Sequence, residues 1–282
     1  ADYTSKEIHG ACGLGGGGWN VRNDINFPEG EISLAEATAK SINTAFVGMA
    51  IQLGGDPCKI RDTGWRMGLH QGNGKEIPPY PSAIILGTWS ASPMTMASTY
   101  QTIANEGVYC PPIPVMSIVK DGKALPLPAL GSACEKRVDP EVARGVTSLL
   151  EGVLRNGGTA DNAGLVGGRP AAGKTGTTNE AKDAWFVGFV PQLAAGVWVG
   201  YDQERSLGSG GTGGQAAAPI WAEFMQKASA SLPVEDFQAP ENVSFVLINP
   251  RTGRLAREGT PGAVMECFIK GSEPNSYDGE GR

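Results

Sequence analysis

Two apolar runs that follow one another closely, residues 183–190 and 193–199, constrain the fold of this chain more than any other feature. Both have the length of a strand and are rich in Val, Phe and Trp. Pro191-Gln192 between them predicts a tight turn. Residues 174–178 predict a third strand, joined to this hairpin by the polar turn 179–182. The sequence therefore predicts three adjacent antiparallel strands.

The third strand has a pattern suited to a binding edge. Because side chains alternate along a strand, Thr175 and Thr177 are predicted to point to one face, which we expect to be open. Gly176 between them has no side chain, so another backbone or a ligand could approach closely. We therefore expect this edge to receive a ligand.

Helical signals dominate the rest of the chain. Ser33-Leu34-Ala35-Glu36 is a capping box, and a second helical pattern from Ile42 is ended by Gly54-Gly55, so two helices are predicted to meet at Ser41. Further helices are predicted from Pro57, Pro93, Pro140 and Ala216. For the last helix, the predicted buried stripe is Ile220, Trp221, Phe224 and Met225.

The two ends of the chain have a different character. Residues 1–31 are glycine-rich and predict a loop with at most a short strand. Residues 233–240 predict a linker, and the segment from Val243 predicts a small β appendage. The expected domains are residues 1–232, and residues 233–282 as linker and β extension. The expected fold class is α/β (α+β), an antiparallel sheet flanked by helices on both faces.

Composition excludes several function classes. The chain of 282 residues has a net charge of −6 and a sequence pI near 5.1, and Lys and Arg do not cluster, so we expect no nucleic-acid partner. No apolar run has the length of a membrane span and residue 1 does not open a signal peptide, so any anchor is expected outside this chain. Five scattered cysteines predict no zinc site, and their odd number leaves the compartment undecided.

Two short motifs carry chemistry. Lys174-Thr175-Gly176-Thr177 and the earlier Ser41-Ile42-Asn43 match two of the three motifs of penicillin-binding proteins and β-lactamases, with Ile where the second motif is written with Asp. Alone, Ser41 is more often the N-cap of the helix that follows, and Lys174 is a solvated edge lysine that opposes aggregation. The order of the motifs, with the hairpin and a helix after the second, favours the catalytic interpretation.

The chain resembles the transpeptidase domain of class A high-molecular-weight penicillin-binding proteins, the 1A type in particular. The resemblance lies in residues 34–55, 86–112, 171–202 and 266–274. It implies a five-stranded antiparallel sheet between helices. It also implies a serine acyl-transferase that cross-links peptidoglycan stem peptides at a D-Ala-D-Ala bond and is acylated by β-lactams, with no cofactor. The implied location is periplasmic, attached to the cytoplasmic membrane, and the implied full-length protein carries a glycosyltransferase domain.

The resemblance also implies a role for each motif residue. Ser41 would relay a proton from the nucleophile to the leaving D-Ala nitrogen, and Lys174 would hold positive charge beside it. Thr175 and Thr177 would bind the substrate carboxylate along the Gly176 edge, and the Thr177 backbone N–H would donate to the oxyanion. Asn43 would position the peptide amide and the lysine partner of the nucleophile.

The family's first motif, Ser-x-x-Lys, should precede Ser41. The single match in this chain is Ser117-Ile118-Val119-Lys120, which lies after Ser41 in an alternating segment. On a strand Ser117 and Lys120 would face opposite sides, so we reject this match. We therefore expect an upstream segment or companion chain to supply the nucleophile helix, together with strands that cover residues 193–199.

Two alternative functions stay open at this level. Residues 168–175 satisfy the Walker A pattern of nucleotide phosphohydrolases, but the pattern requires a helix directly after the lysine, and here β structure is predicted. A non-catalytic peptidoglycan-binding or β-lactam-sensing module would keep the pocket without turnover. The nucleophile segment is what would separate such a module from an enzyme.

Overall fold

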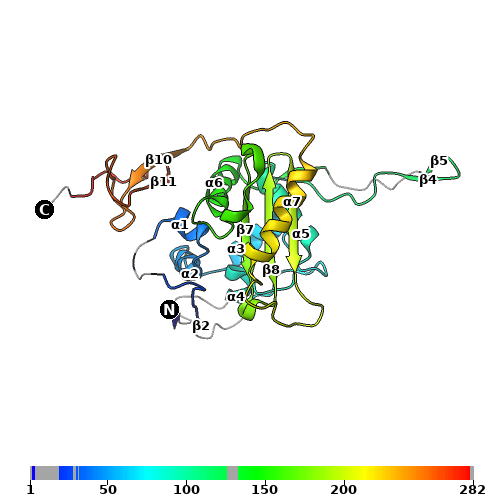
Figure 1. Cartoon of the computed structure of the whole chain (residues 1–282), viewed down its shortest axis with the longest axis horizontal. Coiled ribbons are helices and arrows are strands. Elements are labelled where there is room, and N and C mark those ends of the chain that lie inside the picture. Colours follow the sequence, from blue (N-terminus) through cyan, green and yellow to red (C-terminus); the bar gives the residue numbers. More distant parts are fainter. Residues whose placement is uncertain (1, 4–18, 28–29, 31, 126–132, 280–282) are drawn as a thin grey trace.

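The computed structural model describes residues 2–3, 19–27, 30, 32–125 and 133–279 (Figure 1). The predicted glycine-rich loop falls largely outside these residues. The α-helices are α1 (Leu34–Ala39), α2 (Asn43–Gln52), α3 (Cys58–Arg66), α4 (Pro81–Leu86), α5 (Pro93–Ala104), α6 (Pro140–Glu151) and α7 (Ala218–Ala228). The strands are β1 (Asp2–Tyr3), β2 (Trp19–Asn20), β3 (Val108–Tyr109), β4 (Ile118–Lys120), β5 (Lys123–Leu125), β6 (Glu135–Lys136), β7 (Ala172–Thr177), β8 (Ala184–Val190), β9 (Leu193–Val199), β10 (Val243–Ile248) and β11 (Val264–Ile269).

The central sheet confirms the predicted three antiparallel strands. Its order is β7-β8-β9, with Thr175 paired to Phe186 and Phe186 paired to Val197. Among the described residues β7 and β9 each have one neighbouring strand, β8, so each leaves its other edge without a partner from this part of the chain. The free edge of β7 carries the motif residues Lys174 to Thr177, and the free edge of β9 is the one that we expect a companion segment to cover.

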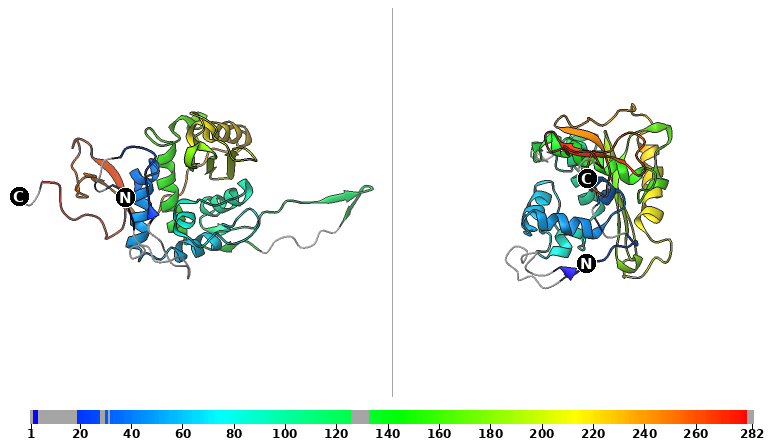
Figure 2. Two further views of the ribbon diagram at one scale, coloured as in Figure 1. Left: turned by 90° about the horizontal axis from the view of Figure 1, so that it is seen from below. Right: turned by 90° about the vertical axis from the view of Figure 1, so that its left-hand side faces the viewer.

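Helices cover both faces of the sheet, as predicted, so the body has three layers with the sheet in the middle. On one face Trp221 of α7 packs on Phe186, with ring centroids 4.9 Å apart. On the other face Tyr100 of α5 packs edge-on against Phe189, beside Leu150 of α6. The right-hand view of Figure 2 shows α7 in yellow on one side of the sheet and the blue and cyan helices on the other.

The helix starts follow local sequence. Ser33, Ser92 and Asp139 each accept a hydrogen bond from a backbone N–H in the first turn of α1, α5 and α6. Proline stands in the first turn of α5 and α6, where its missing N–H costs nothing. Helix α4 was not predicted, although Pro81 at its start is the same kind of signal.

The predicted buried stripe of α7 is half wrong. Trp221 and Met225 are fully buried, but Ile220 is 51% exposed and Phe224 is 55% exposed. Residues four apart share one face of a helix, and the pair 221/225 faces the sheet while 220/224 lies on the flank. An apolar flank therefore stays uncovered by the residues that the structure describes.

A long arm leaves the body between α5 and α6. Strands β4 and β5 pair with each other at its tip, and β3 pairs with β6 at its base (Figure 2). A disulfide between Cys110 and Cys134 ties the two sides of the arm near the base. Cys58 is also disulfide-bonded, and the thiol of Cys267 is free. Asp121-Gly122 forms the turn between β4 and β5.

The segment that leads to the C-terminal hairpin β10–β11 is held on the body by several contacts. The Arg169 guanidinium donates to the carbonyls of Ser229, Leu232 and Pro233 at the end of α7, and Phe237 packs against Phe189 at 5.5 Å. The residues that link 233–240 to β10 are held in turn by a carboxylate at the start of α6.

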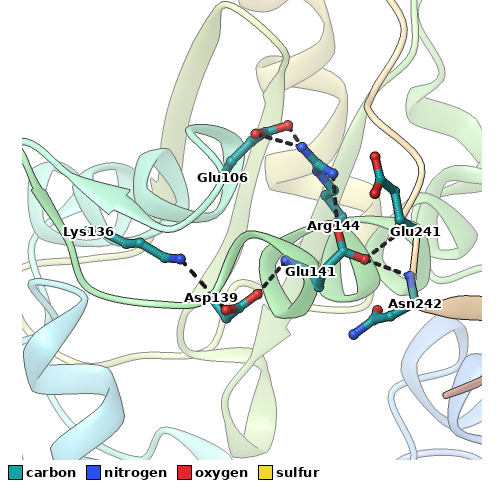
Figure 3. A network of polar contacts seen from close by, with 7 residues as sticks. All are labelled: Glu106, Lys136, Asp139, Glu141, Arg144, Glu241 and Asn242. Carbon is teal, nitrogen blue, oxygen red and sulfur yellow. Dashed lines mark hydrogen bonds and ion pairs between the residues drawn. The ribbon is translucent and has the colours of Figure 1, made fainter.

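That carboxylate belongs to Glu141 (Figure 3). It accepts hydrogen bonds from the backbone N–H groups of Glu241 and Asn242, and Arg144 bridges it to Glu106. The N–H of Asn242 and the other donors around it hold the pKa of Glu141 below its usual value. The predicted linker is therefore fixed at both of its ends.

None of the helices in the part of the chain that the structure describes combines the length and apolarity needed to cross a bilayer.

Candidate active site

Ser41 lies in a strained turn between α1 and α2. The N–H of Ser41 donates to Thr38 O and the N–H of Ile42 donates to Ala37 O, which is the Schellman arrangement that ends many helices. Its left-handed residue is usually glycine, but here it is Ser41, with φ 56°. For a residue with a Cβ this conformation costs on the order of 1–2 kcal/mol, and such strain concentrates at functional sites.

The structure contradicts the purely structural interpretation, in which Ser41 is the N-cap of α2. Ile42 occupies the N-cap position of α2, with extended backbone angles and no side-chain cap hydrogen bond. The Ser41 hydroxyl instead accepts a hydrogen bond from Nζ of Lys174, at 2.7 Å. The two motifs, 133 positions apart in sequence, thus meet at one contact.

Lys174 projects from β7 toward α2. Its ammonium also donates to the Thr175 carbonyl at 3.1 Å and lies 3.4 Å from the Thr175 hydroxyl. Desolvation disfavours the charged form and lowers the pKa of Lys174 from 10.5 to about 8, against the opposing effect of the Asp24 carboxylate. Near neutral pH the group is therefore still largely protonated, yet close enough to its pKa to exchange a proton.

Thr175 and Thr177 lie on one face of β7, as predicted, but that face is not open. Oγ1 of Thr177 accepts a hydrogen bond from the N–H of Gly213 at 3.0 Å, and Oγ1 of Thr175 lies 2.7 Å from Oγ1 of Thr159. The π-helical turn Gly213–Ala217 before α7 covers this face. Both hydroxyls are therefore oriented by neighbours beside the free edge of β7.

The close approach of that turn depends on glycine. A Cβ on Gly213 would lie 2.4 Å from the Trp185 carbonyl oxygen and 2.5 Å from that of Gly176. A Cβ on Gly176 would lie 3.2 Å from Cβ of Trp185, so Gly176 also serves the packing of β7 on β8. The predicted role of Gly176 toward a ligand stays a prediction.

Asn43 follows Ser41 at the first position of α2. Its Nδ2 donates to the Arg22 carbonyl at 2.9 Å, so one amide proton is committed to the backbone of the segment before α1. No sequence pattern points to Asn23 or Asp24 in this segment, nor to Thr159, because each acts through a contact that is remote in sequence. Their roles become visible only in three dimensions.

Two other candidate motifs lie in unsuitable places. Ser117 directly precedes β4 on the exposed arm, and Lys120 ends that strand. Figure 1 shows β4 at the tip of the arm, far from α1 and α2. The Walker A pattern at residues 168–175 runs from a short 3₁₀ turn into β7, with no helix after Lys174. The rejection of Ser117 is therefore confirmed, and β7 lies where a P-loop would require a helix. Among the described residues, no group of three His, Cys, Asp or Glu side chains could hold a metal ion.

The arrangement can move a proton and hold an anion. A serine hydroxyl that touches an ammonium with a lowered pKa can accept a proton on its oxygen while it passes its own proton on. The ammonium, the two threonine hydroxyls and the free backbone edge form a cluster of donors that suits a carboxylate.

Comparison with known proteins agrees with this chemistry. The family model described as penicillin binding protein transpeptidase domain matches residues 8–226. Penicillin-binding protein 1A of Aquifex aeolicus is 36% identical over 257 residues, which cover 91% of this chain and 34% of that protein. Penicillin-binding protein 1A of Pseudomonas aeruginosa is 29% identical, with 92% and 37% covered. The chain therefore spans about a third of the length of the curated relatives it matches.

Solved structures show the same fold. The crystal structure of penicillin-binding protein 1A from Haemophilus influenzae superposes with a TM-score of 0.74 at 23% identity, covering 94% of this chain and 44% of that one. The structure of PonA1 from Mycobacterium tuberculosis in complex with penicillin V gives 0.63 at 30% identity, covering 81% and 61%. Because the family model and a relative above 30% identity both match most of it, this chain belongs to the penicillin-binding protein transpeptidase domain family.

Proposed function

We propose that this chain forms the larger part of a peptidoglycan D,D-transpeptidase, a serine acyl-transferase that is covalently inhibited by β-lactams. The observation that carries the proposal is the hydrogen bond from Lys174 to Ser41 beside the free edge of β7. Family membership and the 1A-type relatives support it. The PonA1 structure, described in complex with penicillin V, supports the β-lactam part.

The proposed reaction has two acyl transfers. A serine hydroxyl of a Ser-x-x-Lys motif, outside residues 1–282, attacks the D-Ala-D-Ala carbonyl, so a C–O bond forms and the C–N bond to the terminal D-Ala breaks. The proton of the nucleophilic serine passes by way of Ser41 to the departing nitrogen, and the positive charge of Lys174 stabilises that transfer. An acceptor amine of a second stem peptide then attacks the ester, forms the cross-link and returns the proton to the serine.

The substrate is proposed to lie along the free edge of β7. Extended peptides bind unpaired strand edges through backbone hydrogen bonds, and β7 offers such an edge next to Lys174. The Thr175 and Thr177 hydroxyls would bind the terminal carboxylate while Gly176 lets the peptide approach. The Thr177 N–H would stabilise the oxyanion, and Asn43 would hold the peptide amide. None of these steps requires a cofactor.

The free edge of β9 is the reason to propose a further segment of the protein. Among the described residues β9 has one neighbouring strand, and Trp198 on it is 36% exposed while its other apolar side chains are half-buried. Such an edge promotes aggregation unless it is covered. An upstream segment would supply the covering strands and the nucleophile helix. Residues 1–232 would form the transpeptidase domain and 233–282 the linker and β extension. A glycosyltransferase domain, a membrane anchor and a periplasmic location would complete the protein, as the resemblance to the 1A type implies.

Intact-mass measurement of the complete protein after incubation with a penicillin tests the proposal. We expect a mass increase of one penicillin per chain. Release of D-Ala from a D-Ala-D-Ala peptide with an acceptor amine should accompany it. An adduct without D-Ala release would point to a sensing module, and no adduct at all would overturn the proposal.

A further inference from the structure

The N-terminus of α2 is capped from another part of the chain. Ile42, the N-cap residue, has no side-chain acceptor. The N–H of Thr44, in the first turn, instead donates to Oδ1 of Asn23 at 3.0 Å, and Nδ2 of Asn23 donates to the Thr44 hydroxyl at 3.1 Å. Both polar atoms of the Asn23 amide therefore engage one residue of α2.

Further contacts hold the segment around Asn23 against α2. The Arg22 carbonyl accepts the hydrogen bond from Asn43, and Val21, which is 2% exposed, packs in a small core with Val47 of α2. The next residue is Asp24, the carboxylate that acts on Lys174. Asn23 thus lies between a buried anchor and the candidate site.

This external cap matters because of what Ser41 would do without it. The first N–H groups of a helix lack intrahelical acceptors, and serine is among the best residues to supply one. Ser41 precedes Ile42 directly, so it is the nearest side chain that could turn to the start of α2. Turning there would remove its hydroxyl from Lys174.

We propose that Asn23 is a positioning residue of the active site: by capping α2 from outside, it leaves the Ser41 hydroxyl free to accept from Lys174. Asn23 itself touches no reacting atom. Its effect on the reaction rests on the proposed function, whereas its effect on the direction of the Ser41 hydroxyl does not.

Three variants of the complete protein test this role through the rate of acylation by a penicillin and the thermal midpoint. Asn23→Ala removes the cap, and we expect the limiting acylation rate to fall about tenfold, which corresponds to about 1.4 kcal/mol and lies within the range of lost N-caps. The penicillin concentration that gives half of this rate should not change. Asn23→Asp keeps an acceptor for the Thr44 N–H and should restore most of the rate.

Ser92→Ala is the matched control, because it removes a side-chain cap, the 3.1 Å bond from the Thr95 N–H, from a helix that does not carry Ser41. It should lower the thermal midpoint to a similar extent without slowing acylation. An unchanged rate in Asn23→Ala, or an equal loss in Ser92→Ala, would overturn the positioning role.

If the unaltered protein forms no adduct, the proposed function fails, and a crystal structure of Asn23→Ala still decides the inference. We expect the Ser41 hydroxyl to leave Lys174 for an N–H of the first turn of α2. A retained Ser41–Lys174 hydrogen bond in that variant would refute the inference.

Discussion

Lys174→Met separates the catalytic from the structural role of this lysine. Methionine keeps an unbranched side chain of similar length but removes the charge and the hydrogen bond to Ser41. Loss of a charged donor that acts on a transition state costs about 10²-fold or more in rate. We therefore expect acylation of the complete protein by a penicillin to slow by about that factor.

The same substitution should hardly change stability. A fall of the Lys174 pKa from 10.5 to about 8 means that keeping the ammonium charged in the folded state costs on the order of 3 kcal/mol. An uncharged methionine avoids this cost. Against this gain stand the lost hydrogen bonds to Ser41 and the Thr175 carbonyl, each about 1–2 kcal/mol. The two effects nearly cancel, so we expect the free energy of unfolding to change by less than about 2 kcal/mol.

Stopped-flow acylation with a fluorescent penicillin and urea unfolding measure the two quantities on the same samples. Lys227→Met is the control, because Lys227 is exposed on α7 and pairs with Glu223 at 2.6 Å, away from the site. It should change neither quantity by much. Acylation of Lys174→Met within threefold of the unaltered protein would refute the assignment of this lysine to the reaction.

Other parts of the structure lead to three more expected outcomes. The rate of acylation should fall as the pH rises through about 8, where Lys174 loses its proton. The free energy of unfolding should instead rise between pH 8 and 10.5, because Lys174 takes up a proton on unfolding in this range. A flat rate profile up to pH 10 would contradict this assignment. Glu141→Ala should release the β extension, seen as faster hydrogen exchange at Glu241 and Asn242, while Glu106→Ala should leave these amides protected. ATP or GTP with Mg²⁺ should not raise the thermal midpoint, and a shift that saturates with nucleotide would revive the P-loop interpretation.

Much of the fold could be predicted because its signals are local. The capping box at Ser33, the glycines at 54–55 and the alternation within residues 183–199 each act over a few residues, and the structure follows them. The flank of α7 was mispredicted for the opposite reason. Hydrophobicity alone placed Ile220 and Phe224 inside, but which apolar face is buried depends on the neighbours that reach the helix.

The site shows the same limit more sharply. The local pattern makes Ser41 a capping residue, and that interpretation fails because Asn23 supplies the cap and Lys174 engages the hydroxyl. The motif resemblance alone suffices to pair Ser41 with Lys174. It carries no information on Asn23 or Thr159, because their contacts join segments that no short motif spans.

The central claim is that Ser41 and Lys174 serve a nucleophile that lies outside residues 1–282. Peptide mapping of the penicillin adduct on the complete protein tests it most directly. We expect the adduct on the serine of a Ser-x-x-Lys motif upstream of residue 1. An adduct on Ser41 itself, or on Ser117 of the arm, would contradict the account.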